Sequence, residues 1–100
     1  MIRVLLVQPW TSNHAPIQAE LERAGLTVAI VRVDFEPALH AALTGARFDL
    51  VIYDPAIATL SRAKLDDCMR AAGGDVPLVV ADDLATLGER ARRLVHARSS

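Results

Sequence analysis

Four short apolar runs, separated by segments of helical periodicity, constrain the fold of this chain more than any other feature of its sequence. The runs cover residues 2–7, 27–33, 48–53 and 76–81 and are rich in valine, isoleucine and leucine. The first, third and fourth are apolar almost without interruption, which is typical of parallel strands that are covered on both faces. The second run alternates more between apolar and polar residues, so we expect it at an edge of the sheet.

The first two connecting segments carry helix signals at both ends. Asn13 can cap the first helix, Pro16 fits its first turn, and Gly25 is a typical helix end. Pro37 opens a second, shorter helix that Gly45 ends. Both segments also place apolar residues at helical spacing, so each can turn one face toward the sheet.

The last two helical segments have similar ends. Ser61 caps the third helix, and Gly73 and Gly74 end it. The fourth begins at Asp82 or Asp83. Strand and helix therefore alternate four times, which predicts the α/β class: an open parallel sheet of about four strands, with right-handed crossovers and helices on both faces.

Length and composition indicate one ordinary globular domain. The chain has 100 residues, of which 52% are hydrophobic and 23% charged, and its formal net charge is −1. We expect a single domain over residues 1–98, with residues 99–100 as a tail. Basic residues gather near the C-terminus, at Arg90, Arg92, Arg93, His96 and Arg98. We interpret them as cations that complement the negative end of the last helix rather than as a nucleic-acid site.

Cysteine content and hydropathy indicate a reducing compartment. Cys68 is the only cysteine and has no metal-ligand or redox spacing to other residues, so we expect a partly buried thiol. No apolar run approaches the roughly 20 residues that cross a bilayer, and the start of the chain lacks a signal-sequence pattern. We therefore expect a cytoplasmic protein that does not bind membranes.

One carboxylate, Asp54, lies at the predicted end of a buried strand. Asp54 follows the buried run 48–53 directly, and in open α/β sheets ligands and chemistry collect outside the carboxyl ends of the strands. Asp82 follows a neighbouring run and could lie close enough to share a cation or a proton with Asp54. The alternative is that Asp82 or Asp83 caps the last helix through backbone N–H groups, and we favour it.

The order of elements resembles the response-regulator receiver domain, a flavodoxin-like module that takes a phosphoryl group from a histidine kinase. The resemblance covers most of the sequence, and its most specific piece is "ARFDLVIYD", in which Asp54 occupies the place of the phospho-accepting aspartate. The family also has an acidic pair after the first strand that binds Mg²⁺. Here those positions read Gln8, Pro9 and Trp10, so Mg²⁺ binding of the family type should be greatly weakened.

Two further family residues are missing. The position of the activating hydroxyl falls on Asp82 or Ala81, and no lysine is available after the last strand, since Lys64 is the only lysine. The chain is also short by about one strand–helix unit. The last two elements could be the fourth strand and fourth helix of the family, or a strand fused directly to the closing helix. A truncated sheet exposes a strand edge, so we expect a homodimer formed through the last strand and helix.

The resemblance implies a degenerate receiver of two-component signal transduction, acting as a phosphorylation-independent interaction module. Such a protein is not an enzyme, needs no cofactor or metal, and has protein partners such as a histidine kinase or a fused effector domain. One alternative is an atypical receiver that is phosphorylated on Asp54, with Asp54 and Asp82 or Asp83 as substitute ligands for Mg²⁺. Another is a domain that binds flavin or a cobalamin-like molecule, although the Asp-x-His-x-x-Gly loop of cobalamin-binding domains is absent.

Trp10 allows two interpretations. An exposed tryptophan often anchors a protein contact, whereas a buried one would fill the pocket that lost its metal. The isolated His14 and His40 lack ligand spacing and are expected at the surface.

Overall fold

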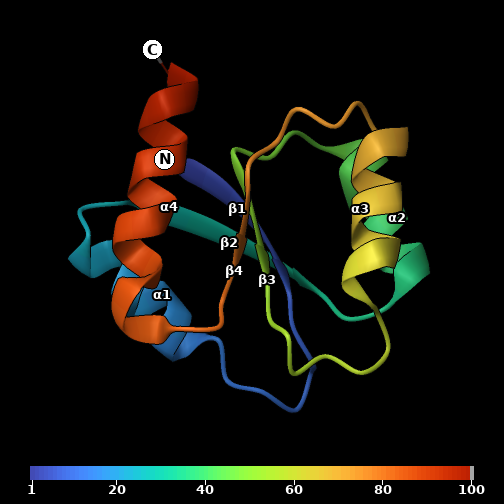
Figure 1. Cartoon of the computed structure of the whole chain (residues 1–100), viewed down its shortest axis with the longest axis horizontal. Coiled ribbons are helices and arrows are strands. Elements are labelled where there is room, and N and C mark those ends of the chain that lie inside the picture. Colours follow the sequence, from blue (N-terminus) through green and yellow to red (C-terminus); the bar gives the residue numbers. More distant parts are fainter. Residues whose placement is uncertain (100) are drawn as a thin grey trace.

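The computed structural model describes residues 1–99 and shows four strands that alternate with four helices (Figure 1). The strands are β1 (Ile2–Val7), β2 (Val28–Val33), β3 (Leu50–Tyr53) and β4 (Leu78–Val80), and the helices are α1 (Ala15–Arg23), α2 (Glu36–Gly45), α3 (Arg62–Ala71) and α4 (Leu84–Ser99). All strand pairs are parallel, in the order β2-β1-β3-β4. The predicted α/β class, the parallel sheet and the edge position of β2 are confirmed.

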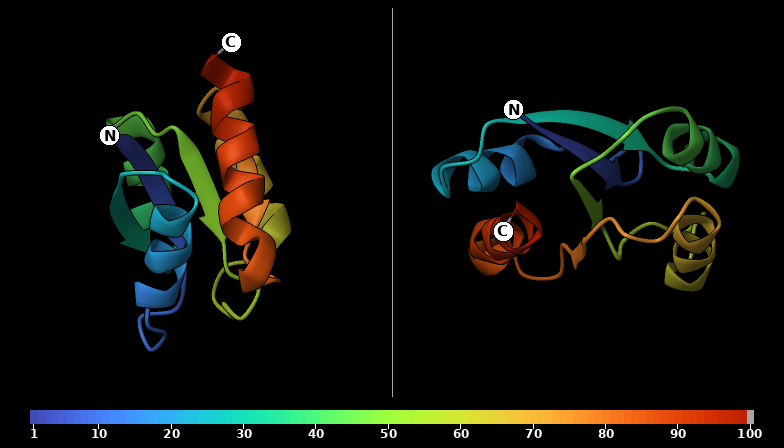
Figure 2. Two further views of the ribbon diagram at one scale, coloured as in Figure 1. Left: turned by 90° about the vertical axis from the view of Figure 1, so that its left-hand side faces the viewer. Right: turned by 90° about the horizontal axis from the view of Figure 1, so that it is seen from above.

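Helices cover both faces of the sheet (Figure 2). Alternate residues of β1 show why: Val4 and Leu6 pack with α1 and α4, whereas Leu5 and Val7 pack with α2 and α3. All four are fully buried. An uninterrupted apolar strand of this kind has a core on each side, as the sequence indicated.

The helix ends follow the predicted signals, with shifts of one or two residues. The Ser61 hydroxyl accepts a hydrogen bond from the Lys64 N–H and caps α3 as expected. Asn13 bonds the Ala15 N–H, but the N-cap position itself is His14. Helix α4 starts at Leu84, just after the predicted Asp82 or Asp83, and it continues through residue 99, one residue into the predicted tail; Ser100 lies outside the described residues.

The position of α4 identifies the missing unit. The chain crosses the sheet in one direction from β2 to β3 and from β3 to β4, so right-handed crossovers place α2 and α3 on the same face. Helix α1 connects β1 to β2, which is a step in the opposite direction, and it therefore lies on the other face. A helix leading to a strand beyond β4 would lie beside α3. Instead α4 packs against α1. Of the two alternatives, the structure therefore has β4 fused directly to a closing helix.

No helix within the described residues is both long and apolar enough to cross a membrane.

Candidate functional site at the carboxyl ends of the strands

Asp54 lies at the tip of β3, as predicted. Its backbone N–H donates to the Val7 carbonyl (2.9 Å), which continues the pairing of β3 with β1 and fixes the residue at this edge. The half-buried carboxylate accepts from the Ala56 N–H through Oδ1 (2.9 Å) and from the side-chain amide of Gln8 through Oδ2 (3.3 Å). Both carboxylate oxygens of Asp54 thus have partners within the chain.

Gln8 is the central residue of the site. It follows β1 directly, is only 3% exposed, and is the one buried polar residue in the described part of the chain. Its Nε2 donates to Asp54 and to the Asn13 carbonyl (3.5 Å), while its Oε1 accepts from Arg32 Nη1 (3.5 Å). A buried amide satisfied on both its oxygen and its nitrogen stays in one orientation, because losing a partner would leave a polar group unpaired in the core.

Arg32 completes the arrangement and was missed by the sequence prediction. It lies near the end of β2, and its guanidinium donates to the Ser12 carbonyl (2.9 Å) and the Trp10 carbonyl (3.1 Å). It also lies over the Trp10 ring, 4.7 Å from the centroid. The signal in the sequence was a single arginine within the apolar second run. The loop after β1 is thus wrapped around a cation that the chain itself supplies.

Trp10 does not fill a pocket, because 60% of it is exposed. Its neighbour Pro9 begins a tight turn, in which the Pro9 carbonyl accepts from the Ser12 N–H (3.0 Å). The interpretation of Trp10 as a buried plug is wrong. The Arg32 guanidinium covers one side of the ring, and the rest faces outward.

Asp82 and Asp83 bind partners of their own. Asp83 Oδ1 accepts from the Ala85 N–H (3.1 Å) at the start of α4, while Asp82 pairs with Arg90 (3.1 Å). The prediction that one of these residues caps α4 therefore applies to Asp83. Asp82 forms an ion pair with Arg90 and does not share a cation or a proton with Asp54.

These residues do not fit a magnesium ion. Mg²⁺ prefers several oxygen ligands including carboxylates, yet Asp54 is the one carboxylate among the hydrogen-bond partners of the Gln8 side chain. Within the described residues no group of three or more histidine, cysteine, aspartate or glutamate side chains could hold a metal. The Arg32 guanidinium, which contacts Gln8, would repel a divalent cation brought to the loop after β1.

Comparison with known proteins defines the fold. No family model matches the sequence, and no curated protein matches it. Among solved structures, the chain is similar to the receiver domain of a sensor histidine kinase from Pseudomonas aeruginosa, solved with a magnesium ion coordinated in its active-site cleft. The TM-score is 0.69 at 16% identity, and the alignment covers 95% of this chain and 98% of that one. The chain has a receiver fold. It is a truncated receiver fold: residues 1–99 contain no strand beyond β4 and no third helix on the face of α2 and α3.

Proposed function

We propose that this chain is a pseudo-receiver of two-component signal transduction, a non-catalytic module that acts through protein contacts and requires neither a metal nor a phosphorylation cycle. The receiver fold supports the class of function. The observation that carries the phosphorylation-independent role is the chain of contacts from Arg32 through Gln8 to Asp54.

Phosphoryl transfer to a carboxylate needs a cation that neutralises the phosphate oxygens and a nucleophilic oxygen that is free to attack. Here the guanidinium of Arg32 donates to two carbonyls and to Gln8, so it is held against the loop after β1 by the chain itself. The carboxylate oxygens of Asp54 accept from Gln8 and from the Ala56 N–H. The arrangement satisfies itself internally, which suits a static scaffold better than a phosphoryl acceptor.

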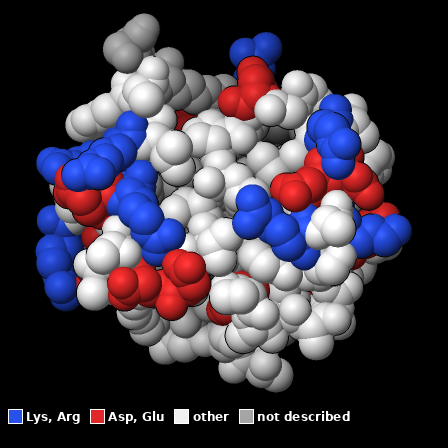
Figure 3. Space-filling model, in the orientation of Figure 1, with Lys and Arg blue, Asp and Glu red and all other residues white. Residues whose placement is uncertain are grey.

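The surface charges support a protein partner rather than nucleic acid. Arg92 and Arg93 of α4 both pair with Glu89, and Arg90 pairs with Asp82. Figure 3 shows basic and acidic side chains interspersed on this face. Because these cations are neutralised locally, they form no continuous basic stripe. We propose a histidine kinase or a fused effector domain as partner, in the cytoplasm.

The free edge of β4 supports a homodimer as part of this proposal. The Pro77 carbonyl accepts from the Val51 N–H, and the Ala81 N–H donates to the Tyr53 carbonyl. Pairing along a strand alternates, so the backbone groups of Leu78 and Val80 point away from β3. A hollow of about 390 Å³ between α3 and β4 lies beside this edge. A second copy can add to such an edge through its own β4.

The test of the proposed function is phosphorylation by a small phosphodonor. We expect no phosphorylated species by intact-mass spectrometry after incubation with acetyl phosphate and Mg²⁺, and no difference between the natural chain and Asp54→Asn. Mg²⁺-dependent phosphorylation that Asp54→Asn abolishes would contradict the proposal and establish the phospho-accepting alternative.

A further inference from the structure

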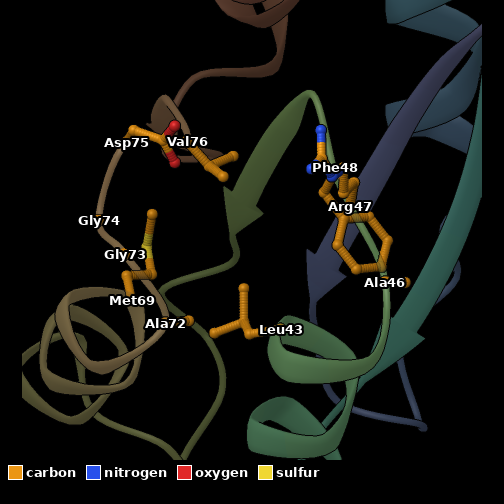
Figure 4. A pocket seen from close by; sticks show the side chains of 10 residues that line it. All are labelled: Leu43, Ala46, Arg47, Phe48, Met69, Ala72, Gly73, Gly74, Asp75 and Val76. Carbon is orange, nitrogen blue, oxygen red and sulfur yellow. The ribbon is translucent and has the colours of Figure 1, made fainter.

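A cavity of about 430 Å³ lies at the end of the sheet opposite Asp54. Its walls come from the segments that lead into β3 and β4 and from the C-terminal ends of α2 and α3 (Figure 4). It belongs to no part of the site around Asp54. Its size is at the lower end of the roughly 300–1,000 Å³ range of small-molecule sites.

Part of the cavity lining is apolar. Phe48 and Met69, which are 4% and 9% exposed, belong to it, together with the half-buried Leu43 and Val76. Leu43 and Val76 extend into the hollow from opposite sides in Figure 4. This surface can accept a small apolar group and exclude water from it.

The mouth of the cavity carries two opposite charges on different walls. Arg47 precedes β3, and Asp75 follows Gly73 and Gly74 on the way to β4. Within residues 1–97, Arg47 is the one lysine or arginine whose side chain has no ion pair, hydrogen bond or aromatic contact. In the same range, the Asp75 carboxylate has no such partner either. The two charges do not satisfy each other across the cavity.

We propose that this cavity binds a small zwitterion with an apolar body, such as an apolar α-amino acid. The ligand carboxylate would bind Arg47, its ammonium group would bind Asp75, and its side chain would contact Phe48 and Met69. A simple anion would be repelled by Asp75 and a simple cation by Arg47, whereas a zwitterion satisfies both. This site is independent of the proposed pseudo-receiver role.

The test uses L-phenylalanine as the probe, with binding followed by backbone amide NMR of the full chain. We expect saturable shifts confined to residues 43–48 and 69–76. Three analogues separate the contributions: N-acetyl-L-phenylalanine lacks the ammonium group, L-phenylalaninamide lacks the carboxylate, and glycine lacks the apolar body. Each should bind at least about tenfold more weakly, the size expected for one charge-assisted hydrogen bond or a buried apolar group.

Variants locate the site. Arg47→Gln should weaken binding of L-phenylalanine about tenfold but strengthen the weak binding of L-phenylalaninamide, because it removes the charge that repels this cation. Asp75→Asn should likewise weaken binding of L-phenylalanine and strengthen that of the anionic acetylated analogue. Arg93→Gln, an exposed arginine on α4, is the matched control and should change nothing. Equal binding of all analogues, shifts centred elsewhere, or no saturable shift from the folded natural chain would each overturn the proposal.

Discussion

The side-chain amide of Gln8 donates to Asp54, with Nε2 3.3 Å from Oδ2, while the amide oxygen of the same residue accepts from Arg32. One buried neutral residue thus joins a guanidinium to the carboxylate at the tip of β3. Where the receiver family has an acidic pair that holds Mg²⁺, this chain has an amide, a turn and an internal cation. The partners of Gln8 at this edge of the sheet thus come from the chain itself.

Replacing Arg32 should loosen the loop after β1. Arg32→Ala removes hydrogen bonds to the Trp10 and Ser12 carbonyls and the contact with the Trp10 ring, so we expect a loss of about 1–2 kcal/mol in the free energy of unfolding. Trp10 is the only tryptophan, and its fluorescence anisotropy should fall. Arg32→Lys should not restore it, because an ammonium cannot reproduce the planar fork. Arg93→Ala is the control, and an equal effect there would refute this role.

Gly88 should be intolerant of a side chain. A Cβ at this position would overlap the Glu20 carbonyl oxygen and lie 3.0 Å from the Ala24 Cβ, where α4 crosses α1. We expect Gly88→Ala to lower the free energy of unfolding by about 1–3 kcal/mol, because backbone must move to admit the methyl group. Gly45→Ala in α2, where a Cβ meets nothing within 4 Å, should instead raise stability by up to about 1 kcal/mol. Chemical denaturation of the two variants checks both signs.

Cys68 should make stability fall in alkali. Burial, followed by the nearby Glu36 carboxylate, raises the pKa of the Cys68 thiol above its ordinary value. The unfolded chain then loses the thiol proton at a lower pH than the folded chain. The contribution is fully present below about pH 8.5 and is lost as the pH rises toward the raised pKa. Comparing unfolding at pH 7 and pH 10, we expect the natural chain to lose more stability than Cys68→Ala; equal losses would contradict this.

The free edge of β4 gives a test of the dimer. Val80→Pro removes an outward-facing N–H without removing a bond to β3, since proline is tolerated on an edge whose N–H faces away from the sheet. We expect a homodimer in light scattering for the natural chain and for the control Val80→Thr, and a folded monomer for Val80→Pro. A natural chain that is monomeric at all concentrations, or a Val80→Pro dimer, would contradict association through β4.

The fold could be predicted because its signals are local and repeated. Uninterrupted apolar runs such as Val4 to Val7 require a core on both faces, and residues such as Ser61 end helices through backbone hydrogen bonds that depend on the nearest neighbours. The position of α4 on the α1 face could not be predicted, because its apolar stripe fits either face. Only the tertiary structure shows that Gly88 permits a close approach to α1.

The site was predicted only in part for a similar reason. Asp54 was located because a strand tip is visible in the sequence. Arg32 was missed because it is 24 residues from Gln8 in the chain and meets it only through the pairing of β1 with β2. The cavity between Arg47 and Asp75 also depends on segments that are distant in the sequence.

The central claim is that the site around Asp54 is satisfied internally and does not respond to phosphoryl chemistry. An amide NMR titration with Mg²⁺, followed by beryllofluoride as a phosphoryl mimic, tests it most directly, with attention to Gln8, Trp10, Asp54 and Ala56. We predict a folded spectrum in which these amides do not shift at either step. Saturable shifts centred on Asp54 would show that the site accepts a cation and a phosphoryl group, and would contradict the pseudo-receiver account.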